Sequence, residues 1–287
     1  MTTTRPTFTQ RLLAGGPLVL PGVGTPLEAA IAVATGFDSL YLSGYATAGW
    51  QTAKPDIGLI GLREVLDCLV PIRTRFDLPI LVDADTGYGD VVNVADTVRR
   101  LEQAGASGVQ LEDQTWPKRC GHLAGKTVEP AEVMVRKLRA ALASRRDPDT
   151  FIVARTDARA PLGLDEAIRR GQLYAETGVD LVFVDAPESL AELARIGREI
   201  PGRLMVNMSE SGLTPDVPAD RLAELGFDVI IYPTGALRVA TAAISKYFSH
   251  LRRTGDSIGA PDGMVPLGEF NALRGIAEYQ SPEDRLQ

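Results

Sequence analysis

Short apolar runs recur along the whole chain, and segments with helical spacing separate most of them. Eight runs are of strand length, at residues 17–20, 38–42, 79–82, 108–111, 151–154, 180–184, 203–206 and 228–232. Their apolar positions are continuous, which is typical of parallel strands covered on both faces. Segments rich in Ala, Leu, Glu and Arg predict helices at 92–103, 130–144, 164–176, 189–199 and 219–225. Strand and helix therefore alternate.

Local turn signals support these boundaries. Gly36, Gly105, Gly178 and Gly226 each fall between a helical pattern and the next strand, where glycine takes the left-handed conformation that ends a helix. The Thr-Pro-Leu-Glu sequence at 25–28 predicts a capping box with proline at the first helical position. Eight such units in about 250 residues favour an α/β fold of the (β/α)8 TIM-barrel type over an open doubly wound sheet.

The C-terminal part has a different pattern. Residues 255–266 are rich in Gly, Pro and Asp, and residues 267–279 form a short amphipathic pattern. We therefore assign 1–254 to a barrel domain and 255–287 to a helical extension. The pattern at 267–279 fits a last barrel helix and an arm packed on another subunit equally well.

Composition narrows the range of partners. The 287 residues are 45% hydrophobic, with a net charge of −7 and a pI near 5.0, so no basic surface is expected to bind nucleic acid. The longest apolar runs are strand-sized and too short to cross a membrane. Only two cysteines, Cys68 and Cys120, and no signal-like segment after Met1 predict a cytoplasmic protein without a disulfide framework.

Candidate chemistry gathers where the predicted strands end, which is the active-site face of a TIM barrel. Asp83 and Asp85 follow the third strand, and Glu112 follows the fourth. Three converging carboxylates need a compensating cation, and their hard oxygen ligands suit Mg²⁺, with Mn²⁺ as the alternative. The competing explanation is an Asp-rich turn that only caps a helix.

Other strand ends supply candidate substrate ligands. Arg155 follows the fifth strand and is suited either to bind a carboxylate through two hydrogen bonds or to form an internal salt bridge. Asp185 follows the sixth strand. Asn207 and Ser209 follow the seventh and are candidate donors, although both are also ordinary turn residues.

The loop at 111–122 concentrates reactive side chains. Cys120 lies close in sequence to Lys118, Arg119 and His122, and positive neighbours favour a thiolate and tune proton transfer. Cys120 is therefore a candidate acid, base or nucleophile, with an incidental surface thiol as the alternative. A structural zinc site is not expected, because Cys120 and His122 supply two ligands and such a site needs four.

Five motifs resemble, in order, those of the isocitrate lyase and phosphoenolpyruvate mutase superfamily, over nearly the whole chain. They are Tyr-Leu-Ser-Gly at 41–44, Asp-Ala-Asp-Thr-Gly-Tyr-Gly at 83–89, Glu-Asp-Gln at 112–114, Lys-Arg-Cys-Gly-His at 118–122 and Asn-Met-Ser-Glu at 207–210. The Lys-Arg-Cys-Gly-His motif is the most specific of the five. In length the chain is similar to the methylisocitrate lyase and 2,3-dimethylmalate lyase branch.

The resemblance implies a Mg²⁺-dependent oxo-acid lyase that acts on a 2-hydroxy di- or tricarboxylate of the 2-methylisocitrate or 2-alkylmalate type. The products would be a 2-oxo acid such as pyruvate and a second carboxylic acid. Asp85 would hold the metal, with Asp83 and Glu112 ligating directly or through water. The resemblance also implies a homotetramer in which a C-terminal helix is exchanged between neighbours, which favours the arm interpretation of 267–279.

Further residue roles follow from the same resemblance. Tyr41, assisted by Lys118, would remove the hydroxyl proton of the substrate, and Cys120 would return a proton to the carbanion. The candidate substrate-binding residues are Ser43, Gly44, Tyr45, Gly121, His122, Arg155, Asn207 and Ser209, with Asp56 and Asp185 as further support for metal or substrate. The loop at 114–126 is expected to close over the ligand, because a carbanion must be kept from bulk water.

Two positions depart from the pattern of the branch, and other activities stay open. Tyr45 stands where a small residue is common, and Asp185 stands where glutamate is common, so the substrate is not fixed by the resemblance. Trp116 and Pro117 are expected to pack against the barrel mouth. The alternatives are a phosphonomutase or an oxaloacetate decarboxylase of the same superfamily, which often lack the cysteine, and a barrel that binds without catalysis.

Overall fold

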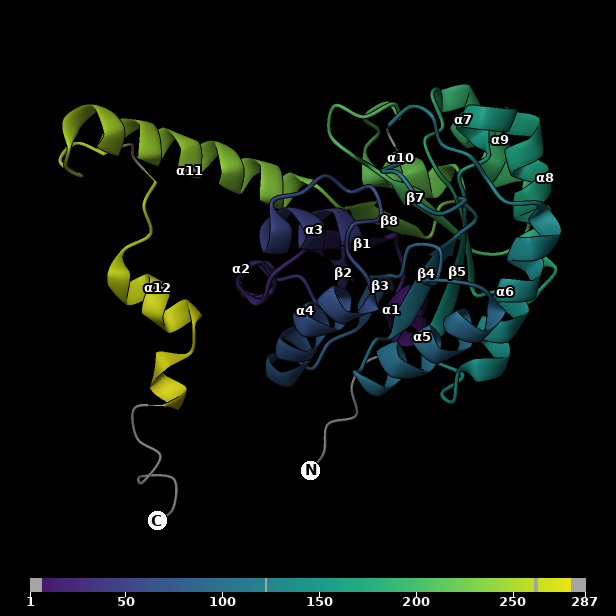
Figure 1. Cartoon of the computed structure of the whole chain (residues 1–287), viewed down its shortest axis with the longest axis horizontal. Coiled ribbons are helices and arrows are strands. Elements are labelled where there is room, and N and C mark those ends of the chain that lie inside the picture. The colour runs from purple at the N-terminus through teal and green to yellow at the C-terminus, as the bar shows by residue number, and fades with distance from the viewer. Residues whose placement is uncertain (1–6, 122, 261–262, 280–287) are drawn as a thin grey trace, which may run out of the picture.

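The computed structural model describes residues 7–121, 123–260 and 263–279 and shows a closed barrel of eight parallel strands (Figure 1). The strands are β1 (Leu18–Val23), β2 (Leu40–Leu42), β3 (Ile80–Asp83), β4 (Gly108–Glu112), β5 (Phe151–Thr156), β6 (Leu181–Val184), β7 (Leu204–Asn207) and β8 (Val229–Tyr232). Each strand pairs with the next along the chain, and β1 closes the barrel on β8 through pairs such as Leu18 with Val229. The predicted (β/α)8 barrel is confirmed.

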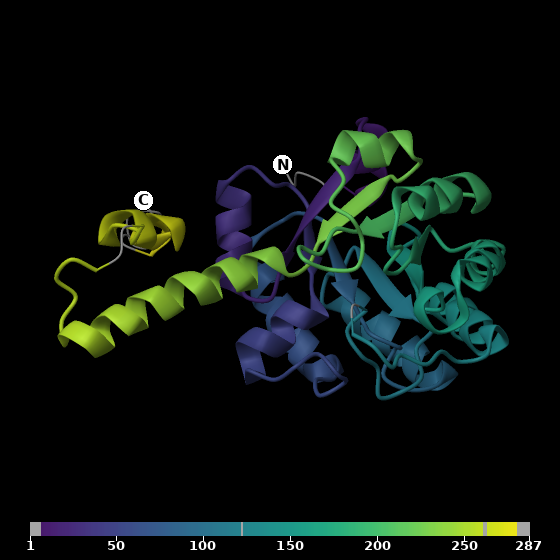
Figure 2. The same cartoon turned by 90° about the horizontal axis from the view of Figure 1, so that it is seen from above.

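Helices surround the strands (Figure 2). They are α1 (Phe8–Leu13), α2 (Pro26–Ala34), α3 (Gly44–Thr52), α4 (Leu62–Arg75), α5 (Val91–Gln103), α6 (Ala131–Ser144), α7 (Arg159–Leu162), α8 (Leu164–Ala175), α9 (Leu190–Glu199), α10 (Ala219–Glu224), α11 (Gly235–Thr254) and α12 (Leu267–Leu273), followed by a 3₁₀ turn (Ile276–Glu278). The five helices for which the sequence predicted residue ranges match α5, α6, α8, α9 and α10 to within one residue at each end.

The predicted helix ends are also observed. The φ angles of the four helix-ending glycines are +100° at Gly36, +93° at Gly105, +89° at Gly178 and +97° at Gly226. Thr25 caps α2 by accepting a hydrogen bond from the Glu28 N–H at 3.1 Å, and Pro26 begins the helix. The Glu28 carboxylate accepts from the N–H of Gly24, at 2.7 Å. Thr25 is therefore the N-cap, as predicted, and the hydrogen bond that Glu28 accepts comes from the N–H one residue before it.

Apolar packing fills one end of the barrel interior and leaves the other end polar. The interior cluster includes Leu20, Tyr41, Leu81, Val153, Phe183, Met205, Val229 and Ile231. Phe8 of α1 joins this cluster, and its ring centroid lies 5.7 Å from that of Phe151 at the start of β5. The N-terminal ends of the strands are thus covered by apolar side chains, so polar groups gather at the C-terminal ends, which we call the mouth.

α11 projects away from the barrel and leads to α12, which lies apart from the mouth (Figures 1 and 2). Along α11, which the structure describes in full, His250 is the one buried residue, whereas Val239 and Phe248 are 71% and 62% exposed. Exposed apolar side chains of this size are typical of a surface that another chain covers. The domain division at residue 254 and the exchange of a C-terminal helix stay predictions.

The helices also bear on the membrane prediction. Within the three described stretches, no helix combines the length and the apolar character needed to cross a bilayer.

Candidate active site

The mouth of the barrel brings together the side chains that the sequence placed at the strand ends. Asp83 ends β3, Glu112 ends β4, Arg155 lies near the end of β5, Asp185 follows β6 and Asn207 ends β7. All five are buried. Charged groups in such surroundings need partners, so the contacts of each residue decide what it does.

Asp83, Asp85 and Glu112, which we call the acid cluster, are linked through the backbone. The Asp85 N–H donates to Asp83 Oδ1 at 3.2 Å, and the Glu112 N–H donates to the Asp85 carbonyl at 2.8 Å. Asp85 has a φ of +49°, a left-handed conformation that only a defined turn holds for a non-glycine residue. Burial raises the pKa of Asp85 to about 7 against the opposing effect of Lys118. Burial also raises the pKa of Glu112 well above its usual range, although Arg155 opposes it.

The acid cluster offers oxygen atoms to a divalent cation, but its three side chains do not converge on one ion. Asp85 Oδ2 and Glu112 Oε1 are buried oxygens that have no hydrogen-bond partner among the described residues. Such oxygens are costly to bury unless a cation or ordered water satisfies them. No group of three or more His, Cys, Asp or Glu side chains within the described chain is arranged to ligate one ion together. The side chains therefore fit an ion held directly by Asp85, with the other two acids acting through water.

Lys118 is the cation beside the acid cluster. Its side chain is 3% exposed, and its Nζ lies 2.7 Å from Asp85 Oδ1 and 2.5 Å from Asp56 Oδ1. Burial alone would lower the pKa of Lys118, but Asp85 and Asp56 outweigh this effect and raise it well above the usual value. Lys118 is therefore a fixed positive charge in this structure, and Asp56 is one of its two partners.

Residues 114–126 are called the lid here, and its described residues, 114–121 and 123–126, lie folded over the mouth. Gln114 fixes the start of the lid, because its amide exchanges hydrogen bonds with the backbone of Arg119 at 2.8 and 2.9 Å. The Cys120 N–H donates to the Asp56 carbonyl at 3.0 Å. A Cβ added to Gly121 would lie 2.0 Å from Asp185 Oδ2, so only glycine permits this close approach. His122 lies outside the described residues.

The closed lid leaves little space at the mouth. The cavity beneath it measures about 40 Å³ and is lined by residues that include Tyr41, Ser43, Tyr45, Asp83, Lys118, Cys120, Arg155, Asn207 and Ser209. A carboxylic acid of several carbons does not fit in this volume, so the lid has to open for substrate to enter. Cys120 also lines a second cavity of about 460 Å³ outside the lid, which gives its thiol a route to solvent.

Arg155 forms the internal ion pairs that the sequence left as one of its two alternatives. Its Nε and Nη2 donate to the two carboxylate oxygens of Asp157 at 2.8 and 2.9 Å. Nη2 also lies 3.2 Å from Asp185 Oδ2, and Nε lies 3.4 Å from Glu112 Oε2. Arg155 still lines the cavity, but its charge is shared among three acids. Sequence reasoning missed Asp157, although it follows Arg155 by two residues at the same strand end.

Lys126 is a second buried cation that sequence reasoning missed. Its Nζ lies 2.9 Å from Asp157 Oδ1 and 3.1 Å from Asp185 Oδ2, and it donates to the Gly121 carbonyl at 2.5 Å. Burial by itself would lower the pKa of Lys126, but the two acids raise it above the usual value. Lys118 and Lys126 therefore attach the two halves of the lid to the acids of the mouth.

The remaining predicted residues have the following places. The Tyr41 hydroxyl donates to Gln110 Oε1 at 3.2 Å, and burial raises its pKa well above the usual value, so the phenol is protonated in this form. Ser43 caps α3 by accepting from the Ala46 N–H at 3.2 Å. A Cβ on Gly44 would lie 3.0 Å from Asp83 Oδ2, so the backbone of α3 closely approaches the acid cluster.

Trp116 and Pro117 lie beside the loop after α3, and their packing against the barrel mouth stays a prediction. Both contact Gly58, in the loop after α3, where an added Cβ would lie 3.2 Å from the indole ring and 3.4 Å from Pro117 Cβ. The indole of Trp116 is about half exposed. These residues therefore join the lid to the loop that carries Asp56.

Comparisons with known proteins find relatives over nearly the whole chain. The family model described as phosphoenolpyruvate phosphomutase matches residues 8–252. A 2,3-dimethylmalate lyase of Eubacterium barkeri is 40% identical over 93% of this chain and 92% of its own length. A 2-methylisocitrate lyase of Aeropyrum pernix is 41% identical over 92% of this chain and 84% of its own. The crystal structure of a phosphonopyruvate hydrolase complex with oxalate and Mg²⁺ superposes with a TM-score of 0.85 and 29% identity, covering 96% and 95% of the two chains.

The two cysteines are expected to differ sharply in reactivity. Cys68 is buried, its thiol contacts the Gly24 carbonyl at 3.0 Å, and burial raises its pKa to about 12. A thiol with a raised pKa stays protonated and unreactive until the pH approaches that value. At pH 8 we expect Ellman's reagent to modify one thiol per native chain, Cys120, and two after denaturation. Cys120→Ser should remove the native reaction, and two rapid reactions in the native protein would contradict this assignment.

Proposed function

The chain belongs to the phosphoenolpyruvate phosphomutase family, and we propose that within it the protein is a divalent-metal-dependent carbon–carbon lyase. The proposed substrate is a 2-hydroxy di- or tricarboxylate of the 2-methylisocitrate or 2-alkylmalate type. The products are a 2-oxo acid such as pyruvate and a second carboxylic acid. Relatives named 2,3-dimethylmalate lyase and 2-methylisocitrate lyase, which match most of the chain, support this class.

The observation that carries the proposal is the position of Cys120 on a lid that closes over the acid cluster. Lys118, two residues before it, contacts Asp85 directly, and Cys120 lines the cavity under the lid together with Asp83. A lyase of this kind needs a proton donor next to a site that stabilises an enolate-like fragment. A binding barrel has no use for a thiol and unsatisfied carboxylate oxygens at the same mouth.

The proposed metal is Mg²⁺, with Mn²⁺ as the alternative. Asp85 would hold it, and Asp83 and Glu112 would support it through water. When bound, a divalent ion supplies a positive charge that chelates the hydroxyl and carboxylate of the substrate and stabilises negative charge as the bond breaks. Support comes from the partnerless oxygens of Asp85 and Glu112 and from the Mg²⁺ named with the phosphonopyruvate hydrolase structure.

The chain's own groups would carry the protons and exclude water. Tyr41, with Lys118 nearby, is the proposed group that removes the hydroxyl proton. Because burial holds the phenol protonated in this closed form, loss of its proton has to accompany binding. As the carbon–carbon bond breaks, Cys120 would donate its proton to the carbon of the departing acid. The lid keeps this carbon from bulk water until the proton has been delivered.

Substrate carboxylates would be bound by residues around the same cavity. Asn207 and Ser209 line it, as does Arg155, whose charge is shared with the acids of the mouth. Tyr45, in place of a small residue, narrows the cavity and would limit the size of the substrate. Asp185 binds Lys126 and Arg155 and is proposed to support the site through these cations.

We also propose a homotetramer with an exchanged C-terminal helix, in the cytoplasm. The exposed apolar residues of α11 support the exchange, since a helix projecting into solvent gains stability when another chain covers such side chains. The two free cysteines suit a reducing compartment.

A substrate panel tests the reaction class. The purified protein with Mg²⁺ is incubated with 2,3-dimethylmalate, 2-methylisocitrate, oxaloacetate and phosphonopyruvate, and released oxo acid, oxalate and phosphate are measured. The proposal predicts turnover of an alkylmalate or of methylisocitrate. Turnover of oxaloacetate or phosphonopyruvate alone would favour the other activities of the superfamily, and no turnover by folded protein would favour a binding barrel.

Cys120→Ser tests the proton donor. A hydroxyl is a much weaker acid than a thiol, so we expect the lyase rate to fall by about 100-fold or more, while fold and metal affinity are retained. Cys68→Ser is the matched control and should keep most of the activity, because Cys68 belongs to α4 and does not line the cavity under the lid. An unchanged rate in Cys120→Ser would exclude the proposed role.

Asp85→Asn tests the metal ligand. The variant keeps the size of the side chain but loses its charge, so we expect Mg²⁺ binding measured by calorimetry to weaken by at least tenfold and activity to be lost. Asp96→Asn on the exposed face of α5 is the control for a general loss of negative charge. Normal Mg²⁺ affinity in Asp85→Asn would show that the ion is held elsewhere.

A further inference from the structure

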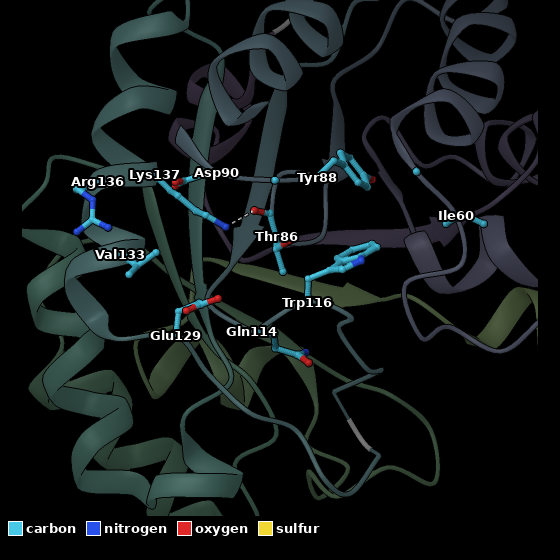
Figure 3. A pocket seen from close by; sticks show the side chains of 12 residues that line it. Ile60, Thr86, Tyr88, Asp90, Gln114, Trp116, Glu129, Val133, Arg136 and Lys137 are labelled. Carbon is cyan, nitrogen blue, oxygen red and sulfur yellow. Dashed lines mark hydrogen bonds between the residues drawn. The ribbon is translucent and has the colours of Figure 1, made fainter. Parts of the chain in front are cut away.

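A cavity of about 650 Å³ lies beside the mouth and is separate from the space under the lid (Figure 3). Its walls are the loop between β3 and α5, the start of the lid, the N-terminal half of α6 and the residues before α4. Among the described residues, its lining has no member in common with that of the 40 Å³ cavity under the lid. Its volume is in the range of small-molecule sites, and the proposed lyase chemistry makes no use of it.

Lys137 places an incompletely paired ammonium group in this cavity. The residue is 8% exposed, and its Nζ donates to the Thr86 carbonyl at 3.1 Å (Figure 3). In the described part of the chain no carboxylate pairs directly with it, and Glu129 and Asp90 act on its charge from a greater distance. An ammonium group has three donors, so Lys137 retains hydrogen-bonding capacity and a buried charge without a direct ion-pair partner. Both would be satisfied by an anion in the cavity.

Glu129 supplies the opposite charge. The backbone around it is fixed, because its N–H donates to the Asp113 carbonyl at 2.8 Å and its carbonyl accepts from Arg170 at 2.8 Å. Figure 3 shows its carboxylate and the Lys137 ammonium directed toward the same space without contacting each other. Glu129 is therefore placed to accept a hydrogen bond from a ligand whose anionic group is on Lys137.

The remaining walls combine apolar side chains with two exposed charged residues, Asp90 and Arg136. Trp116, Val133 and Ile60 line the cavity opposite or beside the lysine ammonium and the glutamate carboxylate (Figure 3). A ligand complementary to these walls has an apolar body and, at one end, a carboxylate next to a hydrogen-bond donor. We propose that this cavity binds a small carboxylic acid that carries an adjacent amino or hydroxyl group and an apolar side chain.

The same cavity is connected to the lid. Trp116 and Gln114 belong to the lid, and Gln114 fixes the turn that leads to Lys118 and Cys120. Thr86, whose carbonyl binds Lys137, directly follows Asp85 of the acid cluster. A ligand that contacts Trp116 in its present position stabilises the closed lid, because a ligand shifts an equilibrium toward the state that it binds better. The cavity is therefore a regulatory site for lid opening.

Calorimetry on the full chain without added metal tests the site. The probes are L-leucine and L-2-hydroxy-4-methylpentanoate, which share a carbon skeleton and differ only in the amino or hydroxyl group. We expect one site per chain for at least one probe. Lys137→Gln, which keeps a donor to Thr86 but removes the charge, should weaken this binding by tenfold or more. Arg139→Gln, which removes an exposed charge of α6 outside the cavity, should leave it unchanged.

Glu129→Gln tests whether the hydrogen-bond donor of the ligand is an amino group or a hydroxyl group. If the wild type prefers leucine and this preference disappears in Glu129→Gln, the ligand is an amino acid. If the hydroxy acid binds the variant as tightly as it binds the wild type, the ligand is a hydroxy acid. Bound probe should also slow the modification of Cys120 by Ellman's reagent in the wild type but not in Lys137→Gln. Absence of binding of either probe up to about 10 mM, or equal binding by Lys137→Gln, would overturn the proposal.

Discussion

The structure depends on the balance of buried charge at the mouth of the barrel. The strand ends bury more carboxylates than cations from the strands can neutralise. Among the described cations of the mouth, Arg155 is the one that a strand supplies. Lys118 and Lys126 supply the missing cations, and both belong to the lid. Burying carboxylates without partners costs free energy. The lid therefore neutralises the acids of the mouth when it closes, because it carries the two lysines.

This coupling explains why the thiol is carried by the lid. Cys120 lies between the two lysines in sequence, so the contacts that hold the lid shut also fix the thiol over the acid cluster. Gly121 permits the closest approach, since any side chain there would collide with Asp185. A divalent ion bound at Asp85 would compete with Lys118 for the same carboxylate, which links metal binding to the position of the lid. The cavity around Lys137 contacts the other side of this lid and of the loop that carries Asp85.

The barrel and most of the candidate site could be predicted from the sequence, because short segments of the chain determine them. Strands covered on both faces are continuously apolar, and glycine at the helix ends fixes where each strand begins, so the barrel followed from short segments. Asp83, Asp85 and Glu112 were found because a residue just past a parallel strand lies at the mouth. The roles of Lys126 and Asp157 were not found, because their pairing joins positions 31 residues apart and depends on how the lid folds back. The choice between the two roles of Arg155 likewise required its neighbours in space.

The rate at which Ellman's reagent modifies Cys120 in a Lys126→Met variant tests the charge-balance account most directly. Arg155 still compensates Asp157 and Asp185 in this variant, so the barrel should fold while the lid loses one of its two attachments. The account predicts modification roughly tenfold faster than in the wild type, with Lys126→Arg and the exposed-site control Lys246→Met close to wild type. A rate unchanged by Lys126→Met would show that buried lysine pairs do not hold the lid closed.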